Sequence, residues 1–284
     1  MPLTTIYDGG TRIIGDATAL EESLHPAVMA YINIMRQTSG GNYAMTVNEI
    51  DAVNNMVKAM VANGIWSKMK AVYPVIGGTA AAHKYNLVDP RDVDAAYRLA
   101  FNGGGWTHSS TGMTPNGTSS WANTFVLPST AFTANTNIHL SYYVRTNDNT
   151  NGYEIGASYD GLSARMQLIA KFSGSGLAYG GYGSFVTATN ANSQGFYINN
   201  SNTTNVQLIK NGNVLATGTA TLNLSLYTAG QTIPLGAERR NTTFFGFSTK
   251  QCAFASIGDG LTAAEAKAFS TIVQTYQTKL GRQV

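Results

Sequence analysis

Residues 206–218 read Val206-Gln-Leu-Ile-Lys-Asn-Gly-Asn-Val-Leu-Ala-Thr-Gly218. Two short runs of β-branched and apolar residues flank the dipeptide Asn211-Gly212. Asn-Gly tolerates the positive φ angles that a type I′ turn requires at both of its central positions. The stretch therefore predicts a two-residue β-hairpin.

Similar short runs, separated by Gly, Asn and Ser, continue on both sides of this hairpin. A spacing of about 8–12 residues between such runs is typical of an antiparallel sandwich or barrel. The predicted strands are Trp121–Leu127, Ile138–Arg145, Tyr153–Tyr159, Arg165–Phe172, Ser184–Ala188, Gly195–Ile198, Val206–Ile209, Asn213–Thr217, Thr221–Leu226, Ile233–Glu238 and Phe244–Ile257.

The N-terminal part has helical periodicity instead. A first helix is predicted over Pro26–Arg36, and Thr46-Val-Asn-Glu49 has the pattern of a capping box that starts a second one. An apolar stripe that includes Met56 and Met60 runs along this second helix, and Ile65-Trp66 follows it. Two interpretations of Met56, Met60, Ile65 and Trp66 stay open: core packing, or an attachment surface for a partner, since Met adapts to irregular surfaces.

The C-terminus returns to helical periodicity. Thr262-Ala-Ala-Glu265 is a second capping box, and an apolar face follows over a helix of about 17 residues. The predicted division is a helical attachment segment over residues 1–70 and a β-sandwich domain with a C-terminal helix over residues 71–284. Residues 1–24 are interpreted as a docking arm or a frayed terminus. In the transition between the two parts, Ala95–Phe101 is predicted as a strand.

Composition limits the function. Only 12% of the 284 residues are charged, about half the usual share, and the formal net charge is +3. A nucleic-acid binder needs clustered Lys and Arg, so this class is excluded. The single cysteine, Cys252, permits no intrachain disulfide. No secretory signal and no apolar run of about 20 residues is found, so we expect synthesis in a cytoplasm, no membrane association, and exit by assembly or lysis.

Two segments carry a resemblance to known families. The hairpin around Lys210-Asn211-Gly212 and the ending Phe254-Ala-Ser-Ile-Gly-Asp-Gly-Leu-Thr-Ala-Ala-Glu265 resemble concanavalin A-like, LamG-like jelly-roll domains. The resemblance covers residues 95–284 and implies two stacked, curved antiparallel sheets.

A second resemblance covers residues 45–125. Gly64-Ile-Trp-Ser-Lys-Met-Lys-Ala-Val-Tyr-Pro74, His83-Lys-Tyr-Asn-Leu87, Asp89-Pro-Arg-Asp92 and Gly105-Trp-Thr-His108 are similar to segments of structural proteins of tailed bacteriophages. This similarity implies a virion component, such as a fibre, capsid decoration, collar or tail protein. It also implies other virion proteins as partners.

Catalysis finds little support in the residues. A glycosidase on a jelly roll needs two opposed carboxylates. Glu154 and Glu238 lie on predicted strands, but no Glu-x-Asp-x-x-Glu arrangement accompanies them, and no Gly-x-Ser-x-Gly elbow is present. Asn147-Asp-Asn-Thr-Asn-Gly152 imitates a calcium loop with Ser158 where Glu is needed, and the four histidines lack metal-ligand spacing. We predict no catalytic residue, no metal and no cofactor.

Glycan binding would use aromatic faces for stacking and short polar side chains for hydroxyl groups. The alternative is that the aromatic residues fill the sandwich core and the Asn/Thr run is a solvated loop. The candidate residues are Trp106, Trp121, Tyr179, Tyr182, Tyr197, Asn199 and Asn202.

These observations lead to one main prediction and two alternatives. The main prediction is a non-enzymatic structural protein of a bacteriophage particle that displays a lectin-like sandwich and assembles as a homo-oligomer. The first alternative is a glycan-binding module for host-cell adsorption, with a host surface glycan as partner. The second is a polysaccharide hydrolase, by analogy of fold alone.

Overall fold

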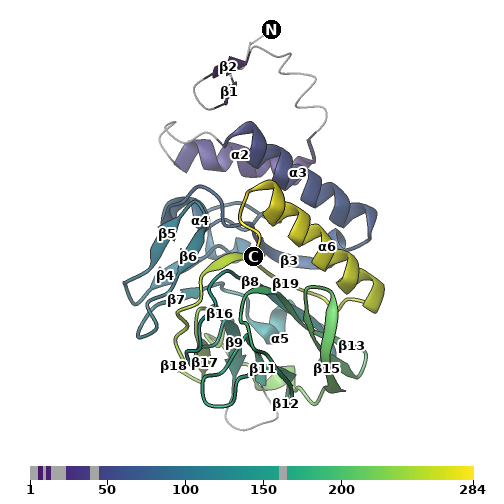
Figure 1. The fold of residues 1–284 in the computed structure, drawn as a ribbon. Coiled ribbons are helices and arrows are strands. Elements are labelled where there is room, and N and C mark those ends of the chain that lie inside the picture. Colours follow the sequence, from purple (N-terminus) through teal and green to yellow (C-terminus); the bar gives the residue numbers. More distant parts are fainter. Residues whose placement is uncertain (1–5, 9–10, 14–23, 39–44, 160–164) are drawn as a thin grey trace.

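The computed structural model describes residues 6–8, 11–13, 24–38, 45–159 and 165–284. Two mainly antiparallel sheets pack face to face, and helices cover one of them on the face that points away from the other sheet (Figure 1). We call the sheet under the helices the helix-side sheet and the other the outer sheet. The predicted fold class, a mainly β sandwich with flanking helices, is confirmed.

The helix-side sheet has the strand order β15-β14-β13-β8-β19-β6-β5, and β3 also pairs with β19. Its longest strands, β8 and β13, run antiparallel over their whole length. Its strands are β3 (Met69–Tyr73), β5 (Thr107–Ser109), β6 (Gly112–Thr114), β8 (Asn137–Val144), β13 (Gly195–Asn202), β14 (Asn205–Lys210), β15 (Asn213–Thr219) and β19 (Cys252–Gly258).

The outer sheet has the order β12-β11-β10-β9-β16-β7-β4, and β17 joins it by pairing parallel to β9 and antiparallel to β18. Its face away from the helix-side sheet points away from the helices (Figure 1). Its strands are β4 (Ala100–Asn102), β7 (Trp121–Asn123), β9 (Ile155–Ser158), β10 (Arg165–Ile169), β11 (Leu177–Tyr182), β12 (Ser184–Thr189), β16 (Pro234–Leu235), β17 (Glu238–Arg240) and β18 (Thr243–Phe245).

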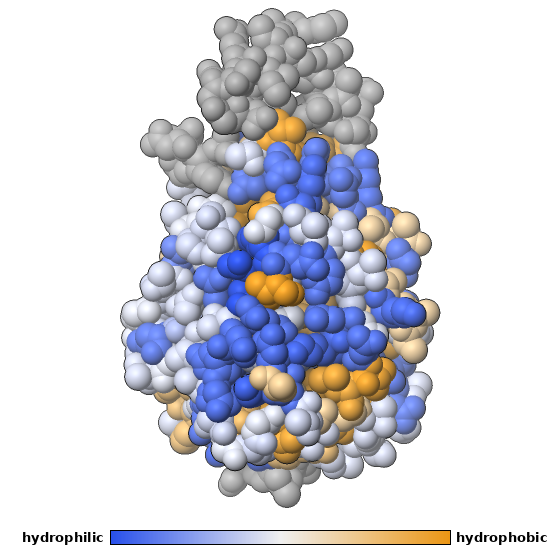
Figure 2. Space-filling model, in the orientation of Figure 1, coloured by the Kyte–Doolittle hydropathy of each residue, from blue (hydrophilic) through white to orange (hydrophobic). Residues whose placement is uncertain are grey.

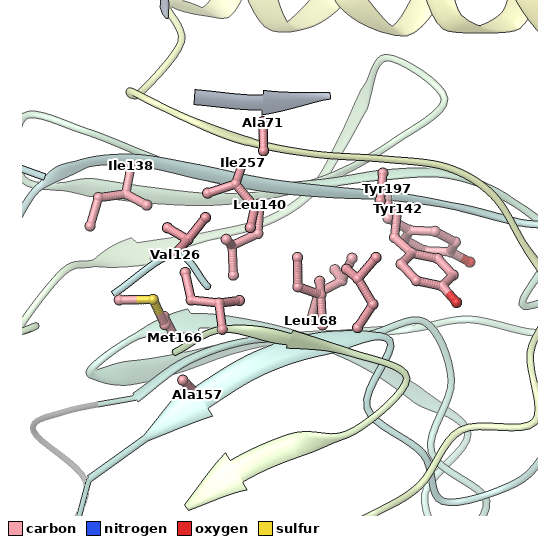
Figure 3. Close-up of a cluster of buried hydrophobic side chains, with 14 of the residues drawn as sticks. Ala71, Val126, Ile138, Leu140, Tyr142, Ala157, Met166, Leu168, Tyr197 and Ile257 are labelled. Carbon is pink, nitrogen blue, oxygen red and sulfur yellow. The ribbon is translucent and has the colours of Figure 1, made fainter. Parts of the chain in front are cut away.

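The main core lies between the two sheets. Leu140 and Ile257 point from the helix-side sheet toward Met166 and Leu168 of the outer sheet, and all four are fully buried (Figure 3). Because side chains alternate along a strand, the residues next to these core positions lie on the opposite faces of their sheets.

A second core lies between the helix-side sheet and the helices. Helix α3 (Val47–Ala62) packs against α6 (Ala263–Lys279) and α2 (Pro26–Thr38). Met56 and Met60 are buried in the same apolar cluster as Phe254 of β19 and Phe269 of α6. This core therefore joins residues on both sides of position 70.

Both predicted capping boxes are present. Thr46 and Glu49 cap α3 reciprocally, and Thr262 and Glu265 do the same for α6. The shorter helical elements are α4 (Ala80–His83), α5 (Pro128–Ala131), η1 (Trp66–Lys68), η2 (Asp94–Ala96) and η3 (Leu224–Leu226), and β1 (Ile6–Asp8) pairs with β2 (Thr11–Ile13). The rest of the predicted arm over residues 1–24 lies almost wholly outside the described residues.

The Asn211-Gly212 hairpin forms as predicted. Asn211 has φ 48° and Gly212 has φ 79°, which are the two positive angles of a type I′ turn. The Asn211 side-chain oxygen accepts hydrogen bonds from the Phe196 amide and from Gln274 of α6. The turn is therefore fixed both to its sheet and to the C-terminal helix.

Several predicted strands differ from the structure. Phe244–Ile257 is two separate strands, β18 and β19, and Ile233–Glu238 is broken between β16 and β17. Ala95–Phe101 contains the 3-10 turn η2 and left-handed Tyr97 (φ 59°), so only β4 remains extended there. Thr221–Leu226 contains η3, and Trp121–Leu127 stops being a strand at Asn123.

Strand β11 was not predicted because it contains glycines, which are unfavourable in strands. At Gly180 the reason for glycine is a close approach between the sheets. A Cβ atom there would lie 2.8 Å from Asn199 Oδ1 of the other sheet.

The face drawn in Figure 2 is largely hydrophilic, and its hydrophobic residues gather in small separate patches. Among the described residues, no helix combines the length and apolar character that crossing a bilayer requires.

Candidate functional site

Two of the predicted sugar-binding tyrosines belong to the core. Tyr182 and Tyr197 are fully buried between the sheets, and Figure 3 shows the Tyr197 ring inside the sandwich beside Tyr142. The Tyr182 hydroxyl donates to the Asn199 carbonyl, and the Tyr197 hydroxyl accepts from Asn190. No face of either ring is open to a ligand, so their prediction as binding residues is wrong.

Asn199 is also a core residue. Its Nδ2 donates to the carbonyl oxygens of Gln167 (3.0 Å) and Gly181 (3.2 Å), which belong to the outer sheet. The side chain therefore links the two sheets from inside, and its prediction as a binding residue is wrong. Asn202, at the end of β13, instead lines a surface pocket of about 270 Å³ with other amide and hydroxyl side chains.

The remaining predicted aromatic residues lie apart from Asn202. Trp106 is partly buried, donates from Nε1 to the Asn102 carbonyl and packs on Phe101. Trp121 stacks on Phe244 with 3.7 Å between ring centroids. Tyr179 is partly buried on β11, on the face of the outer sheet opposite to its core neighbour Ala178.

The predicted attachment residues pack within their own chain. Met56, Met60 and Ile65 are buried in the second core, at 2%, 0% and 0% exposure. Trp66 is partly buried and meets the His25 ring edge to face. Core packing, the other interpretation of the methionine stripe, is confirmed, and an attachment surface made of these buried side chains is excluded.

The outer sheet carries a set of polar residues that sequence reasoning missed. Ser158, Arg165 and Gln167 alternate with core residues of β9 and β10, so they lie on the face away from the core. In the sheet register, Ser158 lies between Arg165 and Arg240, which belong to β10 and β17. We call Ser158, Arg165, Gln167, Glu238 and Arg240 the polar cluster.

Glycines flank the glutamine of this cluster. Gly156 lies between Gln167 and Glu238 in the register, and Gly181 lies between Gln167 and Phe185. A Cβ atom at Gly156 would lie 2.8 Å from the Gln167 Cβ. The sheet surface beside Gln167 therefore has no side chains of its own.

Several atoms of the polar cluster are buried without a hydrogen-bond partner. Gln167 and Glu238 are fully buried, and Ser158 is 2% exposed. An unpartnered buried polar atom costs about 1–3 kcal/mol, and native proteins contain few of them. Within the described part of the chain, the atoms without a partner are Ser158 Oγ, Arg165 Nε, Gln167 Oε1, Gln167 Nε2 and Glu238 Oε1.

Aromatic and charged side chains border the cluster. The Arg165 guanidinium lies 4.3 Å from the centroid of the Phe185 ring, and Tyr179 meets Phe185 edge to face. Arg240 pairs with Glu238 Oε2 at 2.7 Å and lies over Phe245. Phe185 and Phe245 are 40% and 41% exposed, which is unusual for large apolar side chains.

Tyr153 lies close enough to Glu238 and Arg240 for their charges to act on its phenol. Its pKa is raised, first by burial and then by the Glu238 carboxylate.

Other titratable groups have structural partners. Glu154 is fully buried, pairs with Lys250 at 3.3 Å and accepts from the Ser248 hydroxyl and the Ala170 amide. Cys252 is fully buried, and burial raises the pKa of its thiol to about 12, so it is an inert core residue. No group of three or more His, Cys, Asp or Glu in the described part of the chain is placed to hold a metal ion.

Two histidines form a contact that their spacing did not predict. His83 Nδ1 lies 3.0 Å from His108 Nδ1, and the Gly78 amide donates to His83 Nε2. Burial, followed by the charges of His108 and Arg282, lowers the pKa of His83 to about 3. The pair is therefore neutral in the folded chain near neutral pH.

Comparison with known proteins places the chain by fold only. No family model and no curated protein sequence matches it. A mutant of Trypanosoma rangeli sialidase displaying trans-sialidase activity is similar in structure at 10% identity and a TM-score of 0.50, over 81% of this chain and 40% of that one. The chain thus spans less than half the length of this sialidase, and the similarity shows a shared fold.

Two binding domains have lower scores. The botulinum neurotoxin serotype C1 binding domain has 13% identity and a TM-score of 0.40, over 63% of this chain and 49% of that one. The Ruminococcus gnavus IT-sialidase CBM40 has 16% identity and a TM-score of 0.33, over 44% and 77%.

Proposed function

We propose that this chain is a glycan-binding β-sandwich module whose binding face is the outer sheet around the polar cluster. The observation that carries the proposal is the group of unpartnered buried polar atoms on one face, next to exposed aromatic rings. Sites for small molecules combine a few placed polar groups with an apolar platform, and this face has both.

The hydrogen-bonding groups match the surface of a sugar. A hydroxyl group both donates and accepts, so it satisfies a donor and an acceptor in turn. Gln167 supplies one acceptor and a donor pair, Ser158 supplies both kinds, and Glu238 Oε1 accepts. The exposed ring of Phe185, one strand beyond Gly181, supplies an apolar platform.

The proposed role is binding without catalysis. A glycosidase needs one free carboxyl group to protonate the leaving oxygen and a second carboxylate opposite it. Glu238 is held by Arg240 and Glu154 by Lys250, so each of these two buried acids has a cationic partner.

We further propose that the chain is a structural component of a bacteriophage particle, assembled with other virion proteins, in which the module serves host-cell adsorption. The motifs in residues 45–125 that resemble those of tailed-phage structural proteins, such as Gly105-Trp-Thr-His108, are the support for this role. The detection of the chain by mass spectrometry in purified particles is the expected result. Its absence from particles made by cells that express it would refute the virion role and leave the glycan proposal standing.

A glycan array followed by calorimetric titration tests the binding proposal. We expect the wild-type chain to bind a subset of glycans, and Gln167→Ala to weaken that binding at least tenfold. The matched control is Gln207→Ala, which removes a partly exposed glutamine from β14 of the helix-side sheet, at the Asn202 pocket. Binding lost in Gln207→Ala and kept in Gln167→Ala would place the site at the Asn202 pocket instead, and an array without any hit would refute the function.

A further inference from the structure

The charges of the polar cluster are unbalanced. Arg165 and Arg240 are cationic, and Glu238 is the acidic member, already paired with Arg240 at 2.7 Å. Arg165 forms no ion pair with any of the described residues, and its Nε is buried without an acceptor. Among the described residues, one positive charge on this face is therefore uncompensated.

We infer that the glycan recognised here is acidic, and that Arg165 binds its anionic group, a carboxylate or a sulfate. This inference rests on the proposed function and specifies its ligand class. A guanidinium presents its donors in a rigid fork that matches both groups, and such charge-assisted bonds are about twice as strong as neutral ones.

Ser158 places a second donor beside this arginine. Arg165, Ser158 and Arg240 are neighbours in one row of the sheet register, on strands about 4.8 Å apart. An anion at this row can accept from Arg165 Nε and from Ser158 Oγ, both of which are unpartnered.

The next row fixes the orientation of the ligand. It contains Glu238, Gly156 and Gln167, two residues along each strand from the first row. The Glu238 carboxylate repels an anion and accepts only from a donor, so this row suits neutral hydroxyl groups. The expected ligand therefore has its anionic group toward Arg165 and Ser158, and its hydroxyls toward Gln167 and Glu238.

The ring of Phe185 supports Arg165 from the other side. The guanidinium lies 4.3 Å from the ring centroid, which is within the range of a cation–π contact. The exposed phenylalanine holds the arginine without neutralising it, so the charge stays available to a ligand.

Titration of the full chain with matched glycan pairs tests the inference. The probes are oligomers of glucuronic acid with their carboxyl-reduced counterparts, and a sulfated galactan with its desulfated form. We expect at least tenfold tighter binding to the acidic member of one pair, and the pair that shows it distinguishes carboxylate from sulfate. Arg165→Gln is expected to remove this preference, whereas Arg91→Gln, at an exposed arginine paired with Asp89, keeps it.

Arg165→Lys controls for a folding defect, because lysine retains the positive charge but lacks the forked guanidinium. This variant should keep part of the preference for acidic glycans and lose most of the binding affinity. Equal binding of acidic and neutral members, with Gln167→Ala still deficient, would overturn this inference and leave the proposed function intact. Absence of binding to every probe and every array glycan would overturn both.

Discussion

The substitution Gln167→Met should stabilise the unliganded chain while removing ligand binding. Methionine has a similar length and no amide, so the change removes two buried polar atoms that lack partners. Each such atom costs about 1–3 kcal/mol, so we expect the free energy of unfolding to rise by about 2 kcal/mol. For a chain of this size that corresponds to a rise in melting temperature on the order of 5 °C.

Asn200→Leu is the matched control for this substitution. Asn200 is also a buried amide on a strand, but its Nδ2 donates to the Leu261 carbonyl and its Oδ1 accepts from the Leu261 amide. The leucine would leave both backbone groups of Leu261 without a partner, at about 1–3 kcal/mol each. Asn200→Leu should therefore lower the melting temperature.

The assay is thermal and urea unfolding of wild type and both variants, with and without the glycan identified on the array. Added glycan should raise the melting temperature of the wild type and of Asn200→Leu, but leave that of Gln167→Met unchanged. If Gln167→Met destabilises the chain as Asn200→Leu does, the Gln167 amide has partners in solution, and the argument for a ligand at this face fails.

Three further predictions concern stability. Burial lowers the pKa of His83 from 6.5 to about 3, so as the pH falls below 6.5 this histidine takes up a proton in the unfolded chain before it does so in the folded one. Unfolding by urea should therefore become easier as the pH falls from 6.5 toward 3, and His83→Gln should flatten part of this pH dependence. Gly180→Ala brings a Cβ to 2.8 Å from Asn199 Oδ1, and we expect a loss of about 1–3 kcal/mol in urea unfolding. Thr262→Ala removes a cap that accepts from the Glu265 amide and should cost about 1 kcal/mol in the same assay.

Each of these three predictions has a result that would contradict it. Equal pH dependence in wild type and His83→Gln would mean that other groups, such as buried His139 with its pKa lowered to about 4, account for it. Unchanged stability in Gly180→Ala would show that the sheets can separate at Asn199. Unchanged stability in Thr262→Ala would show that the C-terminal helix needs no cap.

Local features of the sequence predicted most of the elements. The Asn211-Gly212 turn and the capping boxes at Thr46 and Thr262 are determined by residues a few positions apart, and all three form as predicted. Strand β11 escaped prediction because the need for glycine at Gly180 arises from Asn199, a residue of the other sheet. Such a requirement becomes visible only when the sheets are stacked.

Prediction of the site required the register of the strands, which cannot be read from the sequence alone. An aromatic residue on a strand faces the core or the solvent according to parity, and Tyr182 and Tyr197 proved to face the core while Tyr179 does not. Glu238 meets the cluster only because β17 joins β9 in parallel after the chain turns at Gly236. The sequence did contain one indication of this face. Polar Arg165 and Gln167 stand on either side of apolar Met166, and this alternation places both polar side chains on the face of the strand away from the core.

The helix layer and the polar cluster lie on opposite sides of the sandwich, so each can be tethered or altered separately. A chain tethered to a sensor surface through helix α3 should present the cluster to solution, whereas one tethered through Thr187, on β12 near Phe185, should not. Helices α3 and α6 pack against each other, and α6 packs against β13 of the helix-side sheet. Substitutions on the outward face of the outer sheet can therefore accumulate without altering the packing of the helix layer.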